Sequence, residues 1–534
     1  MTSVLPSTGR LQLDGGSLTI DDVVAFARGD AECALTAEAQ EKVRASRQLK
    51  QDLITSGIPI YGVTTGFGDS ANRQISPQKA RALQRNLVRF LGAGTGPIAP
   101  AEVLRATVLL RCNCLAKGNS GVRLELVERI LRLLNNDVLP MIPERGSCGA
   151  SGDLVPLSYL GAAVVGEREV LHRGEVRDTA DVLAELGLEP FELESKEGLA
   201  ITNGTSFTSA FGVLAVKDAE ELAFLCDVTT AMASEALLGN RGHFADFLSE
   251  QKPHPGQVES MRIVHKLIAE SQLSLDSEEI LAGAGMHGLD FVELQHQVQD
   301  KYSIRCAPHV NGALRDTLEW VRRWMEIEIN ASDDNPLFDV DAGRVRSGGN
   351  FYASHPAQAM DSLKIALANI CDLMDRQLEL VVDEKFNVGL TPNLIPFFAD
   401  DDPEAGMHHG FKGMQLCCSA MAAEAIKLSN PASVHSRSTE CHNQDKVSMG
   451  TIAARDARSI VELAQNVAAV HLIAVCQALD LRGPQKASAG TRAVHALVRE
   501  RVPFLEADRR TDLDIAAAVE LIRSGELSRA ALAA

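Results

Sequence analysis

Aromatic residues are scarce in this 534-residue chain. They make up 4% of the sequence, and the tyrosines are only Tyr61, Tyr159, Tyr302 and Tyr352. A reaction that needs a phenol as a proton acceptor must therefore use one of these four side chains.

Positive charge is also in deficit. The chain has 52 lysines and arginines against 71 aspartates and glutamates, a net charge of −19 and a pI near 5.2. Because such a chain repels phosphates, we expect neither nucleic acid nor an anionic membrane as a partner. The sequence has no run of about 18 apolar residues, and its start, MTSVLPSTGRLQLDGG, lacks the apolar part of a signal peptide. We expect a cytoplasmic protein.

Paired cysteines of the CxxC type are absent, although the chain has eleven cysteines. We interpret the cysteines as reduced core residues, which excludes a disulfide or zinc framework. His442 and Asp445 could share a helix face and bind a metal, but no second dense group of ligands accompanies them, so we expect no metal. Several cysteines lie in apolar helical sequence: Cys226, Cys371, Cys417, Cys418 and Cys476.

The pattern of apolar residues changes along the chain. Residues 1–204 predict a mixed domain with short helices, a loop over 58–74, and a hairpin near Gly174. Residues 205–534 predict a domain of long helices, which normally pack in a bundle. The expected fold is mainly α, a long-helix bundle with a smaller mixed N-terminal domain. The long segments with 3.6-residue spacing are 206–238, 256–271, 307–331, 354–384, 413–429 and 449–481.

The segment GSCGASGDLVPLSYL, residues 146–160, places small residues before a helix start. If the backbone is tightly folded here, the Gly152 nitrogen can reach the Ala150 carbonyl carbon and close a five-membered ring. Loss of water from Ser151 then leaves an electrophilic methylene. Ser151 or Asp153 would cap the helix that follows, with Pro156 in its first turn. By itself, such a tripeptide is more often a plain loop that caps a buried helix.

The whole segment resembles the signature of the aromatic amino acid lyase family, the histidine, phenylalanine and tyrosine ammonia-lyases and related aminomutases. The resemblance covers nearly the whole chain and implies the fold of the ammonia-lyase and fumarase superfamily. It also implies the cofactor methylidene-imidazolone (MIO), formed autocatalytically from Ala150, Ser151 and Gly152, and a homotetramer whose active sites draw on several subunits. Further stretches similar to family motifs are YGVTTGFG (61–68), ITNGTSF (201–207), QDKYSIR (299–305), GGNF (348–351) and STECHNQDKVSMG (438–450).

The same resemblance assigns roles to individual residues. Tyr61 would be the base for the β-proton, and its pKa, ordinarily ~10, would have to be lowered by positive charge or hydrogen bonds. Tyr302 would be a second essential tyrosine, and Arg305 would bind the substrate carboxylate through its guanidinium fork. Without the resemblance, Arg305 is more simply a surface arginine, and a packed aromatic at a turn explains Tyr61 equally well. The remaining substrate-binding residues would be Phe90, Leu91, Leu154, Asn203, Gln299, Phe351, Glu440, Asn443 and Gln444.

The expected substrate follows from the Phe90–Leu91 pair and from Gln444. Phe90–Leu91 resembles the apolar pair of plant phenylalanine ammonia-lyases, where tyrosine and histidine enzymes typically have a histidine. Histidine ammonia-lyases have Glu at the position of Gln444. Since an unpaired hydroxyl in an apolar pocket is costly, we expect L-phenylalanine to be converted to trans-cinnamate and ammonia. The alternatives are a phenylalanine or tyrosine 2,3-aminomutase, a tyrosine ammonia-lyase, and a catalytically silent helical oligomer.

Overall fold

The computed structural model describes residues 10–282, 285–286, 288–294 and 297–533. These residues form two compact units, and each unit is assembled from three stretches of the chain. The predicted domains 1–204 and 205–534 stay a prediction, because compact units of this kind do not test independent folding. Unit 1 contains residues up to Lys217, Val321–Asp361 and Pro431–Arg458, and unit 2 contains Asp218–Trp320, Ser362–Asn430 and the residues from Ser459 onward.

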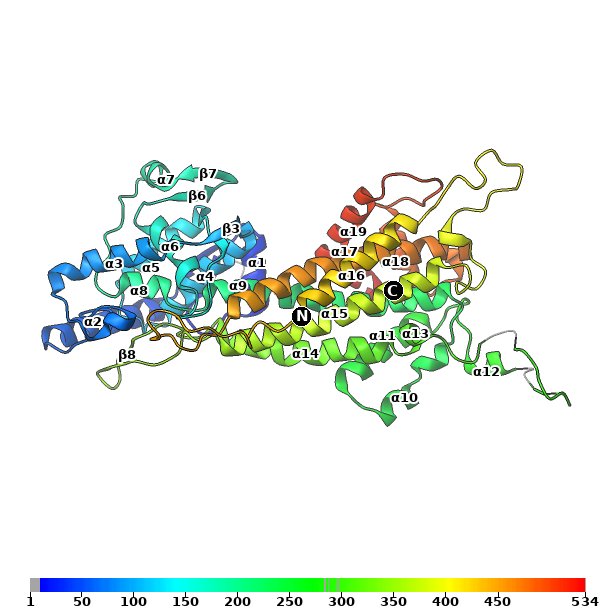
Figure 1. Ribbon diagram of the computed structural model, residues 1–534, viewed down its shortest axis with the longest axis horizontal. Coiled ribbons are helices and arrows are strands. Elements are labelled where there is room, and N and C mark those ends of the chain that lie inside the picture. Colours follow the sequence, from blue (N-terminus) through cyan, green and yellow to red (C-terminus); the bar gives the residue numbers. More distant parts are fainter. Residues whose placement is uncertain (1–9, 283–284, 287, 295–296, 534) are drawn as a thin grey trace. The chain divides into compact units, whose positions relative to one another are not determined.

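The helices of unit 1 begin and end where local sequence signals place them. Thr19 caps α1: its side chain accepts a hydrogen bond from the Asp22 nitrogen at 3.1 Å, and Asp22 accepts one from the Thr19 nitrogen in return. Such reciprocal caps satisfy backbone groups that the first turn leaves free. Figure 1 shows helices α1 (Ile20–Arg28), α2 (Ala37–Thr55), α3 (Pro77–Leu91), α4 (Ala101–Ala116), α5 (Leu124–Asn135), α6 (Leu154–Val164), α7 (Thr179–Glu185) and α8 (Glu197–Thr202).

The strands of unit 1 are short and form small sheets. The hairpin predicted near Gly174 is present, with Gly174 at φ 83° between β6 and β7. β1 (Arg10–Leu13) pairs in parallel with β2 (Glu32–Leu35), whereas the other pairs are antiparallel. These are β3 (Thr95–Ile98) with β5 (Pro143–Arg145), β6 (Glu169–His172) with both β4 (Val138–Pro140) and β7 (Glu175–Asp178), and β8 (Leu337–Asp339) with β9 (Arg344–Arg346).

Long helices dominate the rest of the chain and confirm the predicted mainly α fold. The six long segments predicted from the apolar spacing are present as α9, α11, α14, α15, α16 and α17, with ends that differ by only a few residues. Four of them contribute residues to both units: α9 (Ser206–Ala236), α14 (Ala307–Glu328), α15 (Ser354–Val382) and α17 (Gly450–Arg482). Unit 2 also contains α10 (Asp246–Gln251), α11 (Pro255–Ile268), α12 (Ser277–Leu281), α13 (Tyr302–Arg305), α16 (Lys412–Leu428), α18 (Ala489–Arg499), α19 (Asp512–Ser524) and α20 (Glu526–Ala533).

Helix α17 is long and apolar enough to cross a membrane by length and composition. However, 78% of its apolar window is buried within the protein, as in the core helix of a globular fold. Packing in the core therefore explains the apolar composition of this helix. The expected cytoplasmic location stays a prediction.

The eleven cysteines are all free, and seven of them are buried. Burial raises the pKa of the thiols of Cys226, Cys371, Cys418 and Cys476. The expectation of a core position is wrong for Cys417 and Cys441, which are both exposed. Cys417 is exposed on α16 because the buried face of that helix passes through its neighbour Cys418.

Candidate active site

The Ala150–Ser151–Gly152 turn is tightly folded. The backbone of Gly152 pairs with Ala150 on one side and with Gly204 on the other. Gly152 has φ 69°, and a side chain there would collide with the carbonyl oxygen of Gly204. Only glycine adopts this conformation in this space without strain. The turn therefore fits an MIO group made from these three residues.

Ser151 receives three hydrogen bonds from distant parts of unit 1. Its carbonyl oxygen accepts from the side-chain amide of Asn203 at 2.8 Å and from the Gly204 nitrogen at 3.2 Å. Its hydroxyl accepts from the side-chain amide of Gln444 at 3.1 Å. Two donors aimed at one carbonyl oxygen are suited to stabilise negative charge on it.

Asp153 directly follows this turn, and its carboxylate anchors it through hydrogen bonds. It occupies the N-cap position of α6, and Pro156 lies in the first turn as predicted, but the predicted capping hydrogen bond is absent. Instead its fully buried carboxylate accepts from the hydroxyls of Ser147 at 3.1 Å and Thr451 at 2.6 Å. It also accepts from the nitrogen and the hydroxyl of Thr208, both at 2.8 Å. Burial raises the pKa of Asp153, and these hydrogen bonds oppose that rise.

A cavity of about 550 Å³ opens beside the turn, entirely within unit 1. This volume lies in the range typical of small-molecule sites. Polar groups reach it from Tyr61, Ser70, Thr439, Glu440 and Gln444, and apolar side chains form much of the remaining wall. Its apolar side chains are Phe67, Leu83, Leu87, Phe90, Leu91, Leu154, Val155 and Leu199.

Tyr61 presents a phenol to the cavity, and its oxygen accepts a hydrogen bond from the Gly68 nitrogen at 2.9 Å. Burial raises the pKa of Tyr61, the Gly68 hydrogen bond lowers it, and the negative charge of Glu440 raises it further. The pKa is raised overall, so the expected lowering does not occur in this unit. The physical reasons are burial, which is the largest effect, and a nearby charge that is a carboxylate rather than a cation.

Glu440 stands on a strained turn. Glu440, Cys441 and His442 have φ values of 52°, 53° and 65°, a left-handed conformation that is unusual for residues other than glycine. The turn holds the two carboxylate oxygens of Glu440 at 3.1 and 3.0 Å from the Asp69 nitrogen. Strain of this kind is often found at functional sites.

The structure brings most of the predicted site residues together. Asn203 lies behind the turn, whereas Phe351 and Asn443 belong to unit 1 but do not line the cavity. The roles predicted for all of these residues stay predictions. The predicted residues that line the cavity are Tyr61, Phe90, Leu91, Ala150, Ser151, Gly152, Leu154, Glu440 and Gln444.

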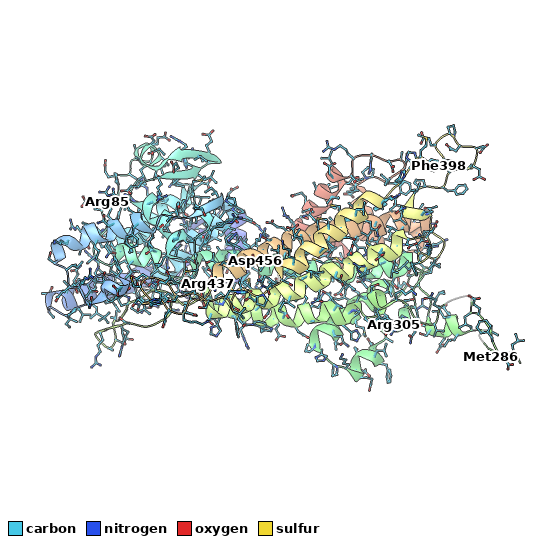
Figure 2. All side chains as sticks on the ribbon, in the orientation of Figure 1. Arg85, Met286, Arg305, Phe398, Arg437 and Asp456 are labelled. Atoms are coloured by element: carbon cyan, nitrogen blue, oxygen red, sulfur yellow. The ribbon has the colours of Figure 1, made fainter. Side chains whose placement is uncertain are left out.

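Three further predicted residues lie in unit 2. Gln299, Tyr302 and Arg305 belong to unit 2 and are absent from the cavity lining. Arg305, labelled in Figure 2, lies on the short helix α13. Its guanidinium stacks 4.6 Å from the centre of the Tyr302 ring, and its Nε donates to the Asp300 carbonyl at 3.0 Å. Tyr302 is 72% exposed. The Tyr302 ring is thus open to solvent, whereas Arg305 is half-buried.

Some residues that line the cavity were not predicted. For two of them, the sequence contains a helix-face pattern that could have indicated them. Leu83 and Leu87 line the cavity with Phe90 and Leu91, and these four residues repeat at the spacing of one helix face along α3. Phe67, Val155 and Leu199 have no such signal, because they reach the cavity from separate elements.

Within the described ranges, no three histidine, cysteine or acidic side chains are grouped to hold a metal ion. The Nδ1 atom of His442 instead forms a hydrogen bond with the Ser438 hydroxyl at 2.8 Å.

Comparison with known proteins identifies the family. The model of the family described as aromatic amino acid lyase matches residues 18–500. A histidine ammonia-lyase of Gloeobacter violaceus is 41% identical over 99% of this chain and 98% of its own length. A histidine ammonia-lyase of Caldanaerobacter subterraneus subsp. tengcongensis is 39% identical over 97% of both chains. The crystal structure of a tyrosine aminomutase from Streptomyces globisporus is 37% identical, with a TM-score of 0.92 over 98% of both chains.

The chain belongs to the aromatic amino acid lyase family. It is a carbon–nitrogen lyase of the ammonia-lyase type.

The expected activity, phenylalanine ammonia-lyase, is wrong. Four curated relatives that match nearly the whole chain at 38–41% identity are histidine ammonia-lyases. The expectation relied on Phe90, Leu91 and Gln444, and such a local match weighs less than identity over the full length. Phe90 and Leu91 do line the cavity, but an apolar wall by itself does not select a phenyl ring.

Proposed function

We propose that the protein removes ammonia from L-histidine and forms trans-urocanate. The observation that carries the proposal is the full-length identity of 38–41% to histidine ammonia-lyases. The size of the cavity, about 550 Å³, is compatible with a single aromatic amino acid.

The electrophile would be an MIO group made from Ala150, Ser151 and Gly152. Its formation joins the Gly152 nitrogen to the Ala150 carbonyl carbon and releases that oxygen as one water. The Ser151 hydroxyl and its Cα proton leave as a second water. The group supplies an electrophilic carbon that no ordinary side chain offers. The amides of Asn203 and Gly204 support this role, because they donate to the Ser151 carbonyl oxygen, where negative charge would collect.

The remaining roles belong to side chains of the chain itself. Tyr61 would take the β-proton, and Gln444, next to Ser151, would hold the amine. Arg305 would bind the carboxylate, with Tyr302 and Gln299 beside it. These last three residues belong to unit 2, and we propose that another copy of the chain supplies them in a homotetramer.

The imidazole ring needs its own partners. A neutral imidazole has one N–H donor and one acceptor nitrogen, and an unpaired polar group costs roughly 1–3 kcal/mol when buried. Phe90 and Leu91 have no polar side-chain atom to offer. Glu440 has a carboxylate in the cavity wall, so we propose that it accepts the ring N–H.

The substrate is tested by kcat/KM for L-histidine, L-phenylalanine and L-tyrosine, with the unsaturated acids and any β-amino acids separated by chromatography. The proposal expects histidine to be preferred by at least tenfold. Glu440→Gln should raise KM for histidine while changing KM for phenylalanine little. A wild type that prefers phenylalanine or tyrosine contradicts the histidine assignment.

The electrophile is tested separately by intact mass. The wild type should weigh two waters less than its sequence, and Ser151→Ala should have its full sequence mass and no turnover. A wild type of full mass that is active would overturn the MIO assignment.

A further inference from the structure

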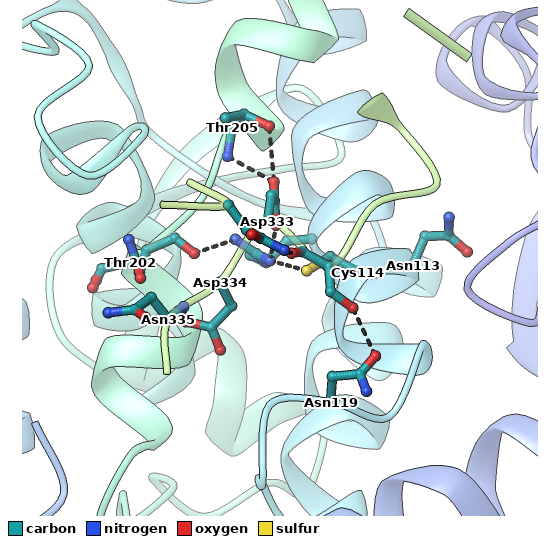
Figure 3. A network of polar contacts seen from close by, with 12 residues as sticks. Asn113, Cys114, Asn119, Thr202, Thr205, Asp333, Asp334 and Asn335 are labelled. Atoms are coloured by element: carbon teal, nitrogen blue, oxygen red, sulfur yellow. Dashed lines mark hydrogen bonds and ion pairs between the residues drawn. The ribbon is translucent and has the colours of Figure 1, made fainter. Parts of the chain in front are cut away.

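A buried ion pair holds the segment that donates hydrogen bonds to Ser151. Arg111 on α4 is fully buried, and its guanidinium donates to the Asp333 carboxylate at 2.6 Å and to the Asn203 carbonyl oxygen at 2.7 Å. The second oxygen of Asp333 accepts from the Thr205 nitrogen at 2.7 Å and lies 2.9 Å from the Thr205 hydroxyl. Figure 3 shows Thr205 and Asp333 joined in this network.

The bonds of the pair flank the two donors. Asn203 donates through its side chain and Gly204 through its backbone nitrogen, and the pair binds the backbone at Asn203 and at Thr205. Gly204 also packs directly against the pair, since a side chain at this position would collide with Arg111 and come within 2.7 Å of Asp333. The position of both donors relative to Ser151 therefore depends on the pair.

We propose that Arg111 and Asp333 are positioning residues for catalysis, which fix the Asn203 and Gly204 donors against the Ser151 carbonyl oxygen. The inference rests on the proposed function of that oxygen as the place where negative charge collects. Neither residue lines the cavity, so neither is expected to touch the substrate. The pair acts through the segment it holds.

The choice of an ion pair at this place supports a positioning role. A buried ion pair gives little net stability, because desolvation of the two charges offsets their attraction. Its charge-assisted hydrogen bonds are short and directional, and the planar guanidinium can bind two acceptors in a fixed geometry. Such bonds are suited to hold a backbone segment within the small tolerance that catalysis needs.

A second buried ion pair next to the first provides a matched control. Lys196 donates to Asp334 at 2.6 Å, and both side chains are fully buried. Lys196 also lies 3.3 Å from the Asn335 carbonyl, but no hydrogen bond described for it or for Asp334 reaches Asn203, Gly204 or Thr205. Neutralising either aspartate therefore removes the same kind of charge from the same depth.

The experiment compares Asp333→Asn with Asp334→Asn, using whichever aromatic amino acid the wild type deaminates. Removal of one such donor typically lowers kcat ~10²–10³-fold. A displaced donor keeps part of its effect, so Asp333→Asn should lower kcat roughly 10- to 100-fold with KM within about threefold. Asp334→Asn should lower the melting temperature comparably and keep kcat within about threefold. Intact mass gives the fraction of chains that have lost two waters, and kcat is expressed per such chain.

Each outcome decides the matter. An unchanged kcat in Asp333→Asn, or an equal loss in Asp334→Asn, overturns the proposal. If Asp333→Asn does not fold, Arg111→Lys replaces it, because lysine keeps the charge but cannot bind Asn203 and Asp333 with one planar fork. That variant should lose kcat in the same way, and full kcat in it overturns the proposal. Failure of the proposed function shows itself separately, as a wild type with no loss of water or no turnover.

Discussion

Gln444 donates a hydrogen bond from its side-chain amide to the hydroxyl of Ser151 at 3.1 Å, across 293 positions of the sequence. The hydroxyl is the group that must leave when the proposed MIO group forms. A donor on a departing oxygen stabilises the charge that develops there.

Gln444→Leu should therefore slow the loss of water from Ser151. Freshly synthesised protein should contain a larger fraction of chains at full sequence mass than the wild type does, as measured by intact mass over time. Asn443→Ala is the control, because this neighbour is exposed and does not line the cavity. A normal rate of mass loss in Gln444→Leu would show that the hydrogen bond has no part in maturation.

Tyr61→Phe should lower kcat by ~10²–10⁴-fold if the phenol is the base. Tyr159→Phe is the control, since Tyr159 is also buried in unit 1 but lies outside the cavity, and it should keep most of kcat. Near-normal kcat in Tyr61→Phe would assign the base elsewhere, with Tyr302 tested next.

The pH profile reports the environment of Tyr61. Burial and Glu440 raise the pKa of Tyr61, and a base acts in its deprotonated form. The rate of the wild type should therefore rise with pH into the alkaline range. Glu440→Gln removes one of the raising causes and should shift this rise to lower pH, measured as kcat/KM against pH. If kcat/KM of the variant rises at the same pH as that of the wild type, the titration of Tyr61 does not determine the pH profile.

Glu328 should make the fold less stable as the pH rises towards neutrality. Burial, together with Asp333 and Asp153, raises the pKa of Glu328 to about 7 from the ordinary 4.5. The Thr205 hydroxyl lies 2.6 Å from Glu328 and 2.9 Å from Asp333, and because it has one proton it can donate to only one ionised carboxylate. A protonated Glu328 resolves this conflict by donating to Thr205.

Between pH 4.5 and about 7 the folded protein binds the Glu328 proton more tightly than the unfolded chain does. Stability is therefore lost as pH rises through this window, by up to about 1.4 kcal/mol per unit. Glu328→Gln keeps a donor for Thr205 without a charge, so its stability relative to the wild type should increase up to about pH 7 and then level off. Urea denaturation at a series of pH values measures this difference. A constant difference would contradict the raised pKa.

His471 should make the fold less stable as the pH falls into the acid range. Both of its ring nitrogens are buried on α17 and have no hydrogen-bond partner among the residues that the structure describes. Burial lowers the pKa of His471 to about 3 from 6.5. The unfolded chain takes up the proton first, so stability is lost as pH falls from 6.5 towards 3, by up to about 1.4 kcal/mol per unit. His471→Leu should lack this loss, as measured by thermal unfolding against pH. If the stability of the variant falls with pH as steeply as that of the wild type, the lowered pKa of His471 is contradicted.

Much of the fold and part of the site could be predicted from the sequence alone. Helix periodicity is a local property, so α9 and α17 have nearly their expected ends. The turn at Ala150–Gly152 was predictable for the same reason, because its three residues are neighbours in the chain and glycine permits the required backbone.

What only the tertiary structure decided depends on residues far apart in sequence. Arg111 and Asp333 are 222 positions apart, and no local pattern indicates that they meet behind Asn203. The raised pKa of Tyr61 likewise comes from burial and from Glu440, which lies late in the chain. Burial and electrostatic interactions depend on distance in space, and a single sequence does not contain those distances until the chain has packed.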